Sequence, residues 1–334
     1  MHGQDLIQLA PMRGMTDFVY RNAFDEHFKG IDLMVAPFIA SVTGARIKPK
    51  LLKDVLPENN RRKSLTPQIL GKSADEFITL SKALYDLGYD AINWNLGCPA
   101  PMVAKKGRGS GLLPYPDRVD ALLEKILNNI PNRLSLKVRL GRFKRDEIFE
   151  LMPIFNRYPL EEIIIHPRTG VQMYKGEVDL EAFQRCVFLS NHPIVYNGDI
   201  VSLISFKKLK RKLAYISTWM IGRGVLANPF LPEMIKAGHS NISSVLLRLK
   251  AFHDTLFERY LEKLCGPSHL LQRMKGIWGY LACNLTDGNH LLKQIRKTKD
   301  LKRYHNVIDA YFDQRGNLAV LNGRNQVDGC FKNG

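Results

Sequence analysis

Short apolar, β-rich runs recur along the first two thirds of the chain at intervals that leave room for one helix between neighbouring runs. They lie at residues 7–9, 33–36, 68–70, 91–94, 134–138, 163–165, 194–196 and 219–221. Helical patterns such as 73–87 and 116–130 separate them, an alternation typical of a parallel sheet. Eight such runs predict an α/β fold, a closed (β/α)8 TIM barrel. An open doubly wound sheet is the alternative, because the number of strands is the weakest step of the prediction.

The strand rhythm stops after Pro232, and the chain then changes character. The residues from about 243 to 311 form amphipathic helical patterns rich in leucine and lysine. We therefore expect a barrel domain over residues 1–240 and a C-terminal all-helical domain over 241–314. Residues 315–334 have many glycines and asparagines and few periodic apolar residues, which predicts a disordered tail.

The charge balance of the chain favours a polyanionic partner. Lysine and arginine number 49 against 32 acidic residues, a formal net charge of +17, so nucleic acid is the first expectation and an acidic membrane surface the second. Five scattered cysteines without a CxxC pair indicate neither a disulfide framework nor a thiolate metal site. No apolar stretch approaches the ~18 residues of a membrane span. We expect a cytoplasmic monomer that needs no metal.

Functional groups of a barrel gather where its strands end. The residues at the ends of the predicted strands are Ala10-Pro11-Met12, Gln68, Asn95, Lys137, His166 with Arg168, Asn197-Gly198-Asp199 and Gly222-Arg223-Gly224. Any one of them alone is more often a cap or a satisfied core polar group. Their recurrence at nearly every strand end predicts a ligand site. The glycines of the last two groups follow neighbouring strands, where barrels commonly bind phosphate, so we expect a phosphorylated cofactor.

The segment NLGCP, residues 95–99, directly follows the fourth strand and places a thiol at the mouth of the barrel. A lone cysteine is usually a small buried apolar residue, but the position of Cys98 favours a catalytic role. The glycine-rich run 107–111 follows a lysine pair rather than a strand, so it is not a dinucleotide-binding fingerprint. We expect residues 105–111 to form a mobile lid, with a plain surface loop as the alternative.

These motifs resemble those of the tRNA-dihydrouridine synthases over roughly residues 6–312. The matching stretches are LAPMRGMTD from Leu9, QILG from Gln68, NLGCP from Asn95, KKGRGSGLL from Lys105, LKVRLG from Leu136, HPRTG from His166, YKGEVD from Tyr174, NGDI from Asn197 and MIGRG from Met220. The most diagnostic pair is NLGCP followed by the KxGxG loop. The resemblance implies an FMN-containing barrel, a helical domain that helps to hold tRNA, and NADPH as reductant.

The resemblance also implies roles for individual residues. The expected cofactor-binding residues are Pro11, Met12, Gln68, Lys137, His166, Asn197, Gly198, Asp199, Gly222 and Arg223. The residues expected to face the substrate are Asn95, Lys105, Arg168 and Tyr174, with Cys98 as the catalytic group. Two positions depart from the family pattern: Pro167 stands where a small residue is usual, and Pro37 where an acidic one is common. These departures weaken any inference about which uridine is bound.

A thiol suits the chemistry that the resemblance implies. The C5=C6 bond of uracil accepts a hydride poorly unless a proton quenches the charge that develops at C5. A cysteine of ordinary acidity is mostly protonated at neutral pH and can still donate. We expect NADPH to reduce FMN, flavin N5 to deliver hydride to C6, and Cys98 to protonate C5. Lys137 would stabilise the negative charge of the reduced flavin, and the target base must first leave its stack.

Three alternatives stay open at this point. The substrate could be ribosomal rather than transfer RNA, since charge does not distinguish the two. A barrel of this kind with FMN could act on a small molecule, as dihydroorotate dehydrogenases and enoate reductases do, although the net charge and the basic clusters 61–63, 207–212 and 293–303 argue against it. A non-catalytic RNA-binding protein is the third, and the presence of Cys98 argues against that.

Overall fold

The computed structural model describes residues 4–42, 44, 47–61 and 64–313, and its contacts divide the chain into two compact units. The barrel unit contains the chain up to Arg13, Asp32–Gly198 and Lys210–Ile221. The helical unit contains Gly14–Ile31, Asp199–Leu209 and the described residues from Gly222 onward. Each unit is therefore assembled from segments that are distant in sequence.

The barrel unit is built on a parallel sheet whose two ends meet. Its strands are β1 (Leu6–Leu9), β2 (Leu33–Val35), β3 (Ile39–Ala40), β4 (Leu65–Thr66), β5 (Gln68–Leu70), β6 (Ala91–Leu96), β7 (Arg133–Gly141), β8 (Leu160–Thr169), β9 (Ile194–Tyr196) and β10 (Thr218–Ile221). They are paired in the order β3-β5-β6-β7-β8-β9-β10-β1-β2-β4. The strand at one end of this order, β3, directly follows β2, and the strand at the other end, β4, directly precedes β5. The sheet therefore closes on itself.

Each of the second and third barrel strands is interrupted once. Pro37 lies between β2 and β3, and Pro67 lies between β4 and β5. A proline has no N–H to donate to the ladder, although the Pro67 carbonyl still accepts from the Asn93 N–H at 2.9 Å. Counting each interrupted pair as one strand, the described residues form eight parallel strands. The predicted (β/α)8 barrel and all eight predicted strand positions are confirmed.

Residues along a barrel strand face alternately outward and inward. On β6, Trp94 packs edge-on against Phe77 of the outer helix α3 (Ala74–Asp86), with ring centroids 5.5 Å apart, whereas Asn93 bonds to side chains of neighbouring strands inside the barrel. A buried apolar layer in the interior is supplied by the first, second, sixth, seventh and eighth barrel strands: Ala10, Val35, Ile164, Val195 and Met220. The interior is thus part apolar and part polar.

The strands β7 and β8 are longer than the sequence pattern predicts. Their pairing continues beyond the apolar runs, through Arg139 opposite His166 to Gly141 opposite Thr169. Two further backbone bonds extend it, from the Gly170 N–H to the Gly141 carbonyl at 2.8 Å and from the Val171 N–H to the Arg142 carbonyl at 3.0 Å. The apolar pattern of the sequence stops at these polar residues. The backbone pairing continues through them, because both strands extend equally far.

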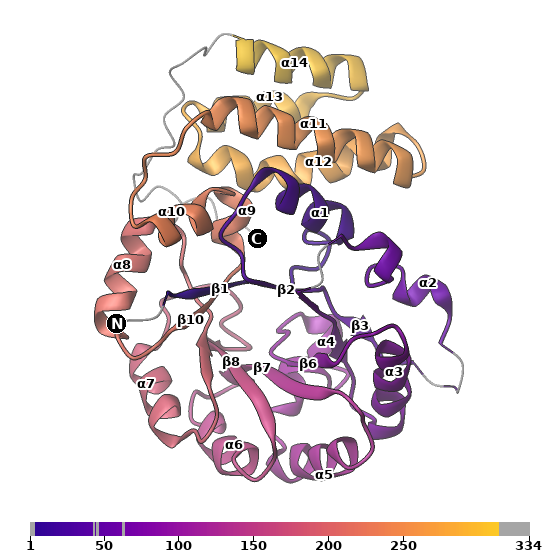
Figure 1. The fold of residues 1–334 in the computed structure, drawn as a ribbon, viewed down its shortest axis with the longest axis vertical. Helices are drawn as coiled ribbons and strands as arrows, with labels where there is room; N and C mark the ends of the chain where they lie inside the picture. Colours follow the sequence, from indigo (N-terminus) through magenta and orange to yellow (C-terminus); the bar gives the residue numbers. More distant parts are fainter. Residues whose placement is uncertain (1–3, 43, 45–46, 62–63, 314–334) are drawn as a thin grey trace. The chain divides into compact units, whose positions relative to one another are not determined.

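Helices cover the outside of the barrel, as Figure 1 shows for α3, α5, α6 and α7. The helices that lie wholly in this unit are α2 (Pro49–Leu52), η1 (Pro57–Asn59), α3 (Ala74–Asp86), α4 (Pro101–Ala104), η2 (Gly109–Leu112), α5 (Pro116–Leu127), α6 (Glu147–Phe155) and α7 (Leu180–Leu189). Another helix, α8 (Leu203–Lys212), is divided between the two units. The predicted helices at 73–87 and 116–130 match α3 and α5.

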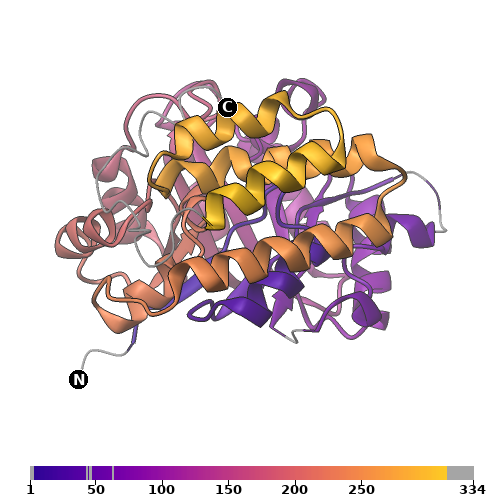
Figure 2. The same cartoon turned by 90° about the horizontal axis from the view of Figure 1, so that it is seen from above.

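The helical unit is all-α within its described residues. It contains α1 (Phe18–His27), α9 (Arg223–Ala227), α10 (Leu231–Ala237), α11 (Val245–Lys263), α12 (Pro267–Leu281), η3 (Ala282–Asn284), α13 (Gly288–Lys297) and α14 (Leu301–Asp313). Figure 2 shows α11 to α14 packed beside one another. The domain boundary expected at residue 240 stays a prediction, and the expected tail at 315–334 lies outside the described residues.

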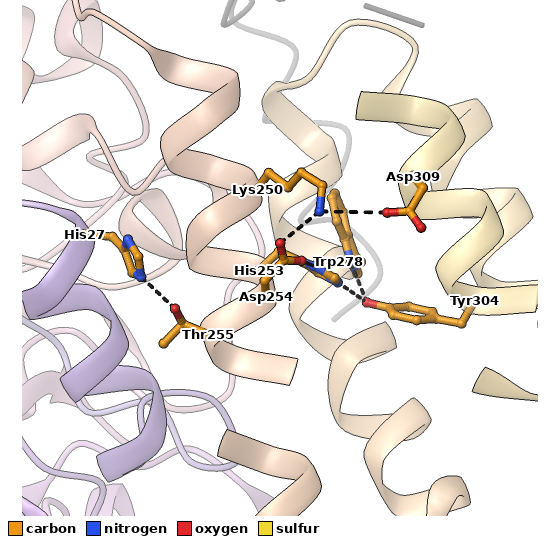
Figure 3. A network of polar contacts seen from close by, with 8 residues as sticks. All are labelled: His27, Lys250, His253, Asp254, Thr255, Trp278, Tyr304 and Asp309. Carbon is orange, nitrogen blue, oxygen red and sulfur yellow. Dashed lines mark hydrogen bonds and ion pairs between the residues drawn. The ribbon is translucent and has the colours of Figure 1, made fainter. Parts of the chain in front are cut away.

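A buried polar network joins three of these helices (Figure 3). His253 of α11 bonds through Nδ1 to Asp254 at 2.8 Å and through Nε2 to the Tyr304 hydroxyl of α14 at 2.7 Å. Trp278 of α12 donates to the same hydroxyl at 2.9 Å. Burial lowers the pKa of His253, so the ring is neutral, with Nδ1–H donating to Asp254 and Nε2 accepting from Tyr304. Every ring nitrogen in the network is thereby paired.

Candidate active site

The backbone around Cys98 is held by the side chain of Asn95, the next-to-last residue of β6. The Asn95 side-chain oxygen accepts from the N–H groups of Gly97, at 3.2 Å, and Cys98, at 2.8 Å. A Cβ at Gly97 would lie 3.3 Å from the Lys137 carbonyl oxygen, so the turn passes close to β7. The half-buried Cys98 is thus placed directly at the carboxyl end of its strand.

The glycine-rich segment packs against the backbone of Cys98. Ser110 donates to the Cys98 carbonyl from its N–H at 3.1 Å and from its hydroxyl at 3.0 Å. Gly109 has φ +57°, and a Cβ there would meet the Cys98 carbonyl oxygen at 2.8 Å. All of Gly109–Leu112 is buried and helical. This part of the run therefore forms a packed wall of the site and is not an exposed surface loop, while Lys105 is exposed just after α4. The closing of residues 105–111 over a bound base stays a prediction.

A chain of side-chain amides leads from this turn into the barrel. The Asn95 amide donates to the Gln68 oxygen at 2.7 Å, the Gln68 amide to the Asn93 oxygen at 2.7 Å, and the Asn93 amide to the Ser135 hydroxyl at 2.8 Å. The Ser135 hydroxyl in turn donates to the Ile92 carbonyl at 3.3 Å. Each amide in this chain donates to the next side chain, so the orientation of Asn95 depends on Gln68 and, through it, on Asn93.

Lys137 stands on β7 opposite Asn95 in the ladder. Burial, with a smaller contribution from Arg139, lowers the pKa of its ammonium to about 7. Within the described residues its side chain has no hydrogen bond or ion pair. A negatively charged or hydrogen-bond-accepting group placed beside Lys137 would therefore stabilise its charged ammonium form.

Arg139, two residues further along the same face, was not singled out from the sequence. It is 2% exposed, and it donates to the carbonyls of Gly97 at 3.1 Å, Thr169 at 2.9 Å and Met173 at 2.6 Å. Its guanidinium lies 5.3 Å from the centre of the Tyr174 ring. Arg139 therefore ties the Cys98 turn to the loop after β8. The signal in the sequence was its spacing of two from Lys137 on a strand, which puts both side chains inside the barrel.

His166 and Arg168 lie two residues apart on β8 and interact. Arg168 Nη1 is 3.1 Å from His166 Nε2. Because a guanidinium only donates, Nε2 must accept, which puts the ring proton of a neutral His166 on Nδ1. Arg168 also donates to the Gly176 carbonyl at 2.6 Å, and the rings of His166 and Tyr174 lie 6.2 Å apart. These three expected site residues are thus brought together.

The remaining expected residues of the barrel unit follow β1 and β9. Pro11 and Met12 are half-buried. The Asn197 amide donates to the Met220 carbonyl at 2.8 Å, and a Cβ at Gly198 would come within 3.0 Å of Val178, so only glycine fits there without displacing a neighbour. Gln68, by contrast, is fully buried with both ends of its amide bonded, and it presents no open face.

The other three expected residues belong to the helical unit. Arg223 donates to Asp199 at 2.8 Å. Asp199 has a left-handed backbone with φ +45°, and Gly222 directly precedes the short helix α9. The structure thus pairs Arg223 with a carboxylate from the loop after β9, although the sequence predicted the two side chains as separate cofactor contacts.

Two further residues that were not predicted from the sequence belong to the amide chain. Asn93 and Ser135 are buried, with exposures of 0% and 4%. The run Ala-Ile-Asn-Trp-Asn-Leu of β6 carried the signal for Asn93, because two asparagines spaced by two must both face the interior. Ser135 precedes Lys137 by two and lies on the same face for the same reason.

Comparisons with known proteins agree with this architecture. The family model described as Dihydrouridine synthase (Dus) matches residues 8–319. A probable tRNA-dihydrouridine synthase of Staphylococcus epidermidis is 28% identical over 91% of this chain and 92% of its own. The tRNA-dihydrouridine synthase B of Pasteurella multocida is 32% identical over 69% of each chain. The tRNA-dihydrouridine(16) synthase of Neisseria meningitidis is 26% identical over 93% of this chain and 96% of its own.

Among solved structures, a morphinone reductase mutant in complex with tetrahydroNAD superposes with a TM-score of 0.51 at 9% identity, over 74% of this chain and 90% of that one. This likeness concerns the fold alone. The barrel, with polar side chains at its strand ends, places the protein in the TIM-barrel class with a candidate active site at that rim. Within that class, the chain belongs to the dihydrouridine synthase family.

The described part of the chain contains no helix long and apolar enough to span a membrane. The same residues contain no group of three or more histidine, cysteine, aspartate or glutamate side chains that could hold a metal ion.

Proposed function

We propose that this protein reduces the C5=C6 bond of specific uridines in tRNA to give 5,6-dihydrouridine, with FMN as bound cofactor, NADPH as reductant and Cys98 as proton donor. Membership of the family and the names of its relatives support the reaction and the substrate. The observation that carries the proposal is the position of Cys98 at the carboxyl end of β6, where its backbone is hydrogen-bonded to the side chains of Asn95 and Ser110.

The residues of the barrel interior fit a flavin. Lys137 supplies an amine whose pKa is lowered by burial and which has no partner within the described residues. An acceptor-rich, partly negative ring edge placed beside it would offset that desolvation. Pro11 and Met12 supply half-buried apolar surface at the end of β1. We assign Lys137 to the polar edge of the ring and Pro11 and Met12 to its face.

Other expected contacts with the cofactor fit less directly. Gln68 is fully buried and has both ends of its amide bonded, so it would act by orienting Asn95 or would have to release one of its bonds. Arg223, with Gly222, would hold the cofactor phosphate, and its bond to Asp199 keeps the guanidinium in one orientation. His166 would contact the cofactor through the Nδ1–H that its bond to Arg168 enforces.

The reaction divides between the cofactor and the chain. When bound, the flavin supplies the hydride that uracil C6 accepts. Cys98 holds the proton for C5, and the two bonds from Asn95 and the two from Ser110 restrict where its thiol can lie. Restricting the donor in this way is the usual contribution of a positioned general acid. Asn95, Lys105, Arg168 and Tyr174 would contact the substrate.

The RNA phosphates would be bound by exposed cations rather than by the catalytic groups. The net charge of +17 favours a polyanion. The surface of α13 and the start of α14 carries exposed cations: Lys293, Arg296, Lys297, Lys299, Lys302 and Arg303. We propose these as phosphate contacts of a tRNA-binding helical domain, and we propose that the enzyme acts as a monomer in the cytoplasm.

Two measurements test the proposal. Mass analysis of the cofactor released from the yellow holoenzyme should identify FMN, and FAD or the absence of any flavin after reconstitution would contradict the assignment. The holoenzyme, supplied with NADPH, should then form dihydrouridine in unmodified tRNA transcripts, as located by nucleoside mapping. Dihydrouridine formed in ribosomal RNA transcripts but not in tRNA would move the substrate to the ribosome.

A further inference from the structure

An open cavity of about 730 Å³ lies at the carboxyl end of β7 and β8, outside the barrel interior. The turn after β7 supplies Phe143 and Arg145 to its walls, and the loop after β8 supplies Val171, Gln172 and Glu177. None of these residues has a part in the reaction proposed above. The cavity is large enough to admit a nucleoside.

The cavity lies next to the Cys98 segment. Arg142, which directly precedes Phe143, donates to the Pro99 carbonyl at 3.2 Å and lies 3.5 Å from the Ser110 hydroxyl. A Cβ at Gly170 would lie 2.8 Å from the same hydroxyl. Both loops that form the cavity therefore pack on the wall that holds Cys98, so the cavity and the Cys98 segment share that wall.

The turn that carries Phe143 is rigid. The Glu147 carboxylate at the start of α6 accepts from three successive backbone N–H groups, of Arg142 at 2.7 Å, Phe143 at 2.9 Å and Lys144 at 2.8 Å. A Cβ at Gly141 would clash with the Lys144 carbonyl oxygen, so the turn is as tight as glycine allows. Yet Phe143 is 62% exposed, with the Arg142 guanidinium 5.6 Å from the centre of its ring. An aromatic ring held in solvent by a fixed backbone is a prepared stacking surface.

The polar groups of the cavity favour a base over a phosphate. Its walls carry three carboxylates, of Glu177, Asp179 and Glu181, against the guanidinium of Arg145. Arg145 is already paired with Asp179 at 2.8 Å and lies 3.6 Å from Glu181. The Glu177 carboxylate has no hydrogen bond or ion pair within the described residues. The lining side chains thus carry more negative than positive charge, which disfavours phosphate at the Glu177 side of the cavity, while a carboxylate accepts hydrogen bonds from amino groups.

We propose that this cavity binds an unpaired nucleobase beside the uridine to be reduced, one that carries an exocyclic amino group, with Phe143 as its stacking platform and Glu177 as its acceptor. This inference rests on the proposed RNA-reducing function. Adenine, cytosine and guanine carry such an amino group and uracil does not. The site therefore prefers substrates in which the base on one side of the target uridine is not another uridine.

The test uses tRNA transcripts in which the base on either side of the mapped target uridine is changed in turn to each of the other three. Single-turnover reduction by the holoenzyme measures the RNA concentration for half-maximal rate. Wild type should require more RNA when uracil occupies the recognised position. Phe143→Ala should raise the half-maximal concentration roughly fivefold or more, the scale of one missing base–aromatic stack, while Phe143→Tyr should retain wild-type behaviour.

Two control measurements sharpen the result. Phe188→Ala removes another exposed phenylalanine, 88% exposed on α7, and should change nothing. Glu177→Gln removes a negative charge, which can raise the affinity for all transcripts equally. If Glu177 is the acceptor for the base, the variant should also show a smaller preference for amino-bearing bases. For each protein, the readout is the half-maximal concentration of the uracil-bearing transcript divided by that of an amino-bearing transcript. This ratio is compared between wild type and Glu177→Gln, with Glu58→Gln on an exposed carboxylate as the control.

The outcomes separate this inference from the reaction itself. If Phe143→Ala matches wild type, or if uracil is recognised as well as the amino-bearing bases, the inference is overturned while dihydrouridine formation stands. If Phe143→Ala instead slows flavin reduction by NADPH, the cavity belongs to the dinucleotide and the inference also fails. If no transcript is reduced at all, the proposed function has failed, and filter binding of the same transcripts still decides whether Phe143 and Glu177 contact RNA.

Discussion

At the scale of single residues, the candidate site is organised around the backbone of Cys98. Asn95 bonds the N–H side of that residue and Ser110 bonds its carbonyl, so the main chain is held from both sides while the thiol stays half-buried. A catalytic thiol needs such placement, and a cysteine that merely fills the core does not. The distinction can be tested by separating the two halves of the reaction.

We predict that Cys98→Ala leaves flavin content and NADPH oxidation nearly unchanged and lowers tRNA reduction by about 10²-fold or more, the contribution expected of a general acid. Stopped-flow traces of flavin reduction and flavin reoxidation by tRNA measure the two steps. Cys265→Ala, which removes an exposed thiol of the helical unit, is the matched control. Equal impairment of both steps would make Cys98 a structural residue.

Lys137 gives a second prediction, on pH. Its pKa is lowered to about 7 by burial, well below the ordinary value near 10.4 of the unfolded chain. Between these two values the unfolded state binds more protons than the folded state, so the stability of the flavin-free protein should rise with pH across this window. The penalty for burying the charge is fully present below pH 7.

We therefore expect the flavin-free wild type to gain stability relative to Lys137→Met as pH rises from 7 toward 10, by up to roughly 1.4 kcal/mol per pH unit. Urea unfolding of both proteins at several pH values measures the difference. Parallel stability curves for the two proteins would show that Lys137 keeps an ordinary pKa in the folded chain.

At the scale of elements, β6 determines how the site is supported. Its two asparagines bond inside the barrel and Trp94 packs against Phe77 of α3, so one strand both packs on an outer helix and carries the amide chain from Asn95 to Ser135. Asn93 sits in the middle of that chain, where it accepts from Gln68 and donates to Ser135. Removing it leaves two buried groups without their partners.

We predict that Asn93→Leu, which keeps the size of the side chain, destabilises the protein by about 1–3 kcal/mol for the groups left unpaired. It should also change the rate of tRNA reduction more than the affinity for tRNA, because Asn95 loses its orientation. Urea unfolding and single-turnover kinetics measure the two effects. Asn129→Ala, on an exposed asparagine at the end of α5, is the control. A variant that is destabilised but has unchanged kinetics would limit Asn93 to a structural role.

At the scale of the whole molecule, charge and chemistry lie on different parts of the chain. On α13 the apolar residues Leu291 and Ile295 are buried, while Lys297, Lys299 and Lys302 in and after this helix are exposed. An amphipathic helix with a basic outer face contacts phosphates without reading sequence.

We predict that neutralising Lys297, Lys299 and Lys302 together weakens tRNA binding and leaves the flavin spectrum unchanged. The slope of log affinity against log salt should flatten by roughly 0.7 to 0.9 for each phosphate that the variant no longer binds. Salt titrations of tRNA affinity for wild type and the triple variant measure both effects.

The control for this experiment is a second triple variant on exposed lysines elsewhere, at Lys29, Lys53 and Lys82. It changes the net charge equally, so a similar weakening in both variants would reveal a general charge effect. Unchanged slopes in the first variant would move the RNA contacts to the basic cluster of α8, at residues 207–212.

The strands, the outer helices and most candidate site residues could be predicted from the sequence, because these depend on local properties. Apolar periodicity sets which residues can be strand or helix, and polar residues at strand ends meet at one rim whenever parallel strands close into a barrel. The prolines at 37 and 67 interrupt their strands for a reason that is equally local. The motif around Cys98 indicated the family without any knowledge of the geometry.

Only the tertiary structure decided what each of those residues touches. The contacts of Ser110 with Cys98, of Arg139 with Thr169 and of Asn93 with Gln68 join residues 12 to 30 positions apart. The network around His253 joins residues up to 51 positions apart. The periodicity of apolar residues does not identify such partners. It indicates the face of a strand or helix on which a side chain lies, but not which other element packs against that face. Closure of the sheet and packing of the helices select the partners, since a buried polar group is stable only where a complementary group meets it.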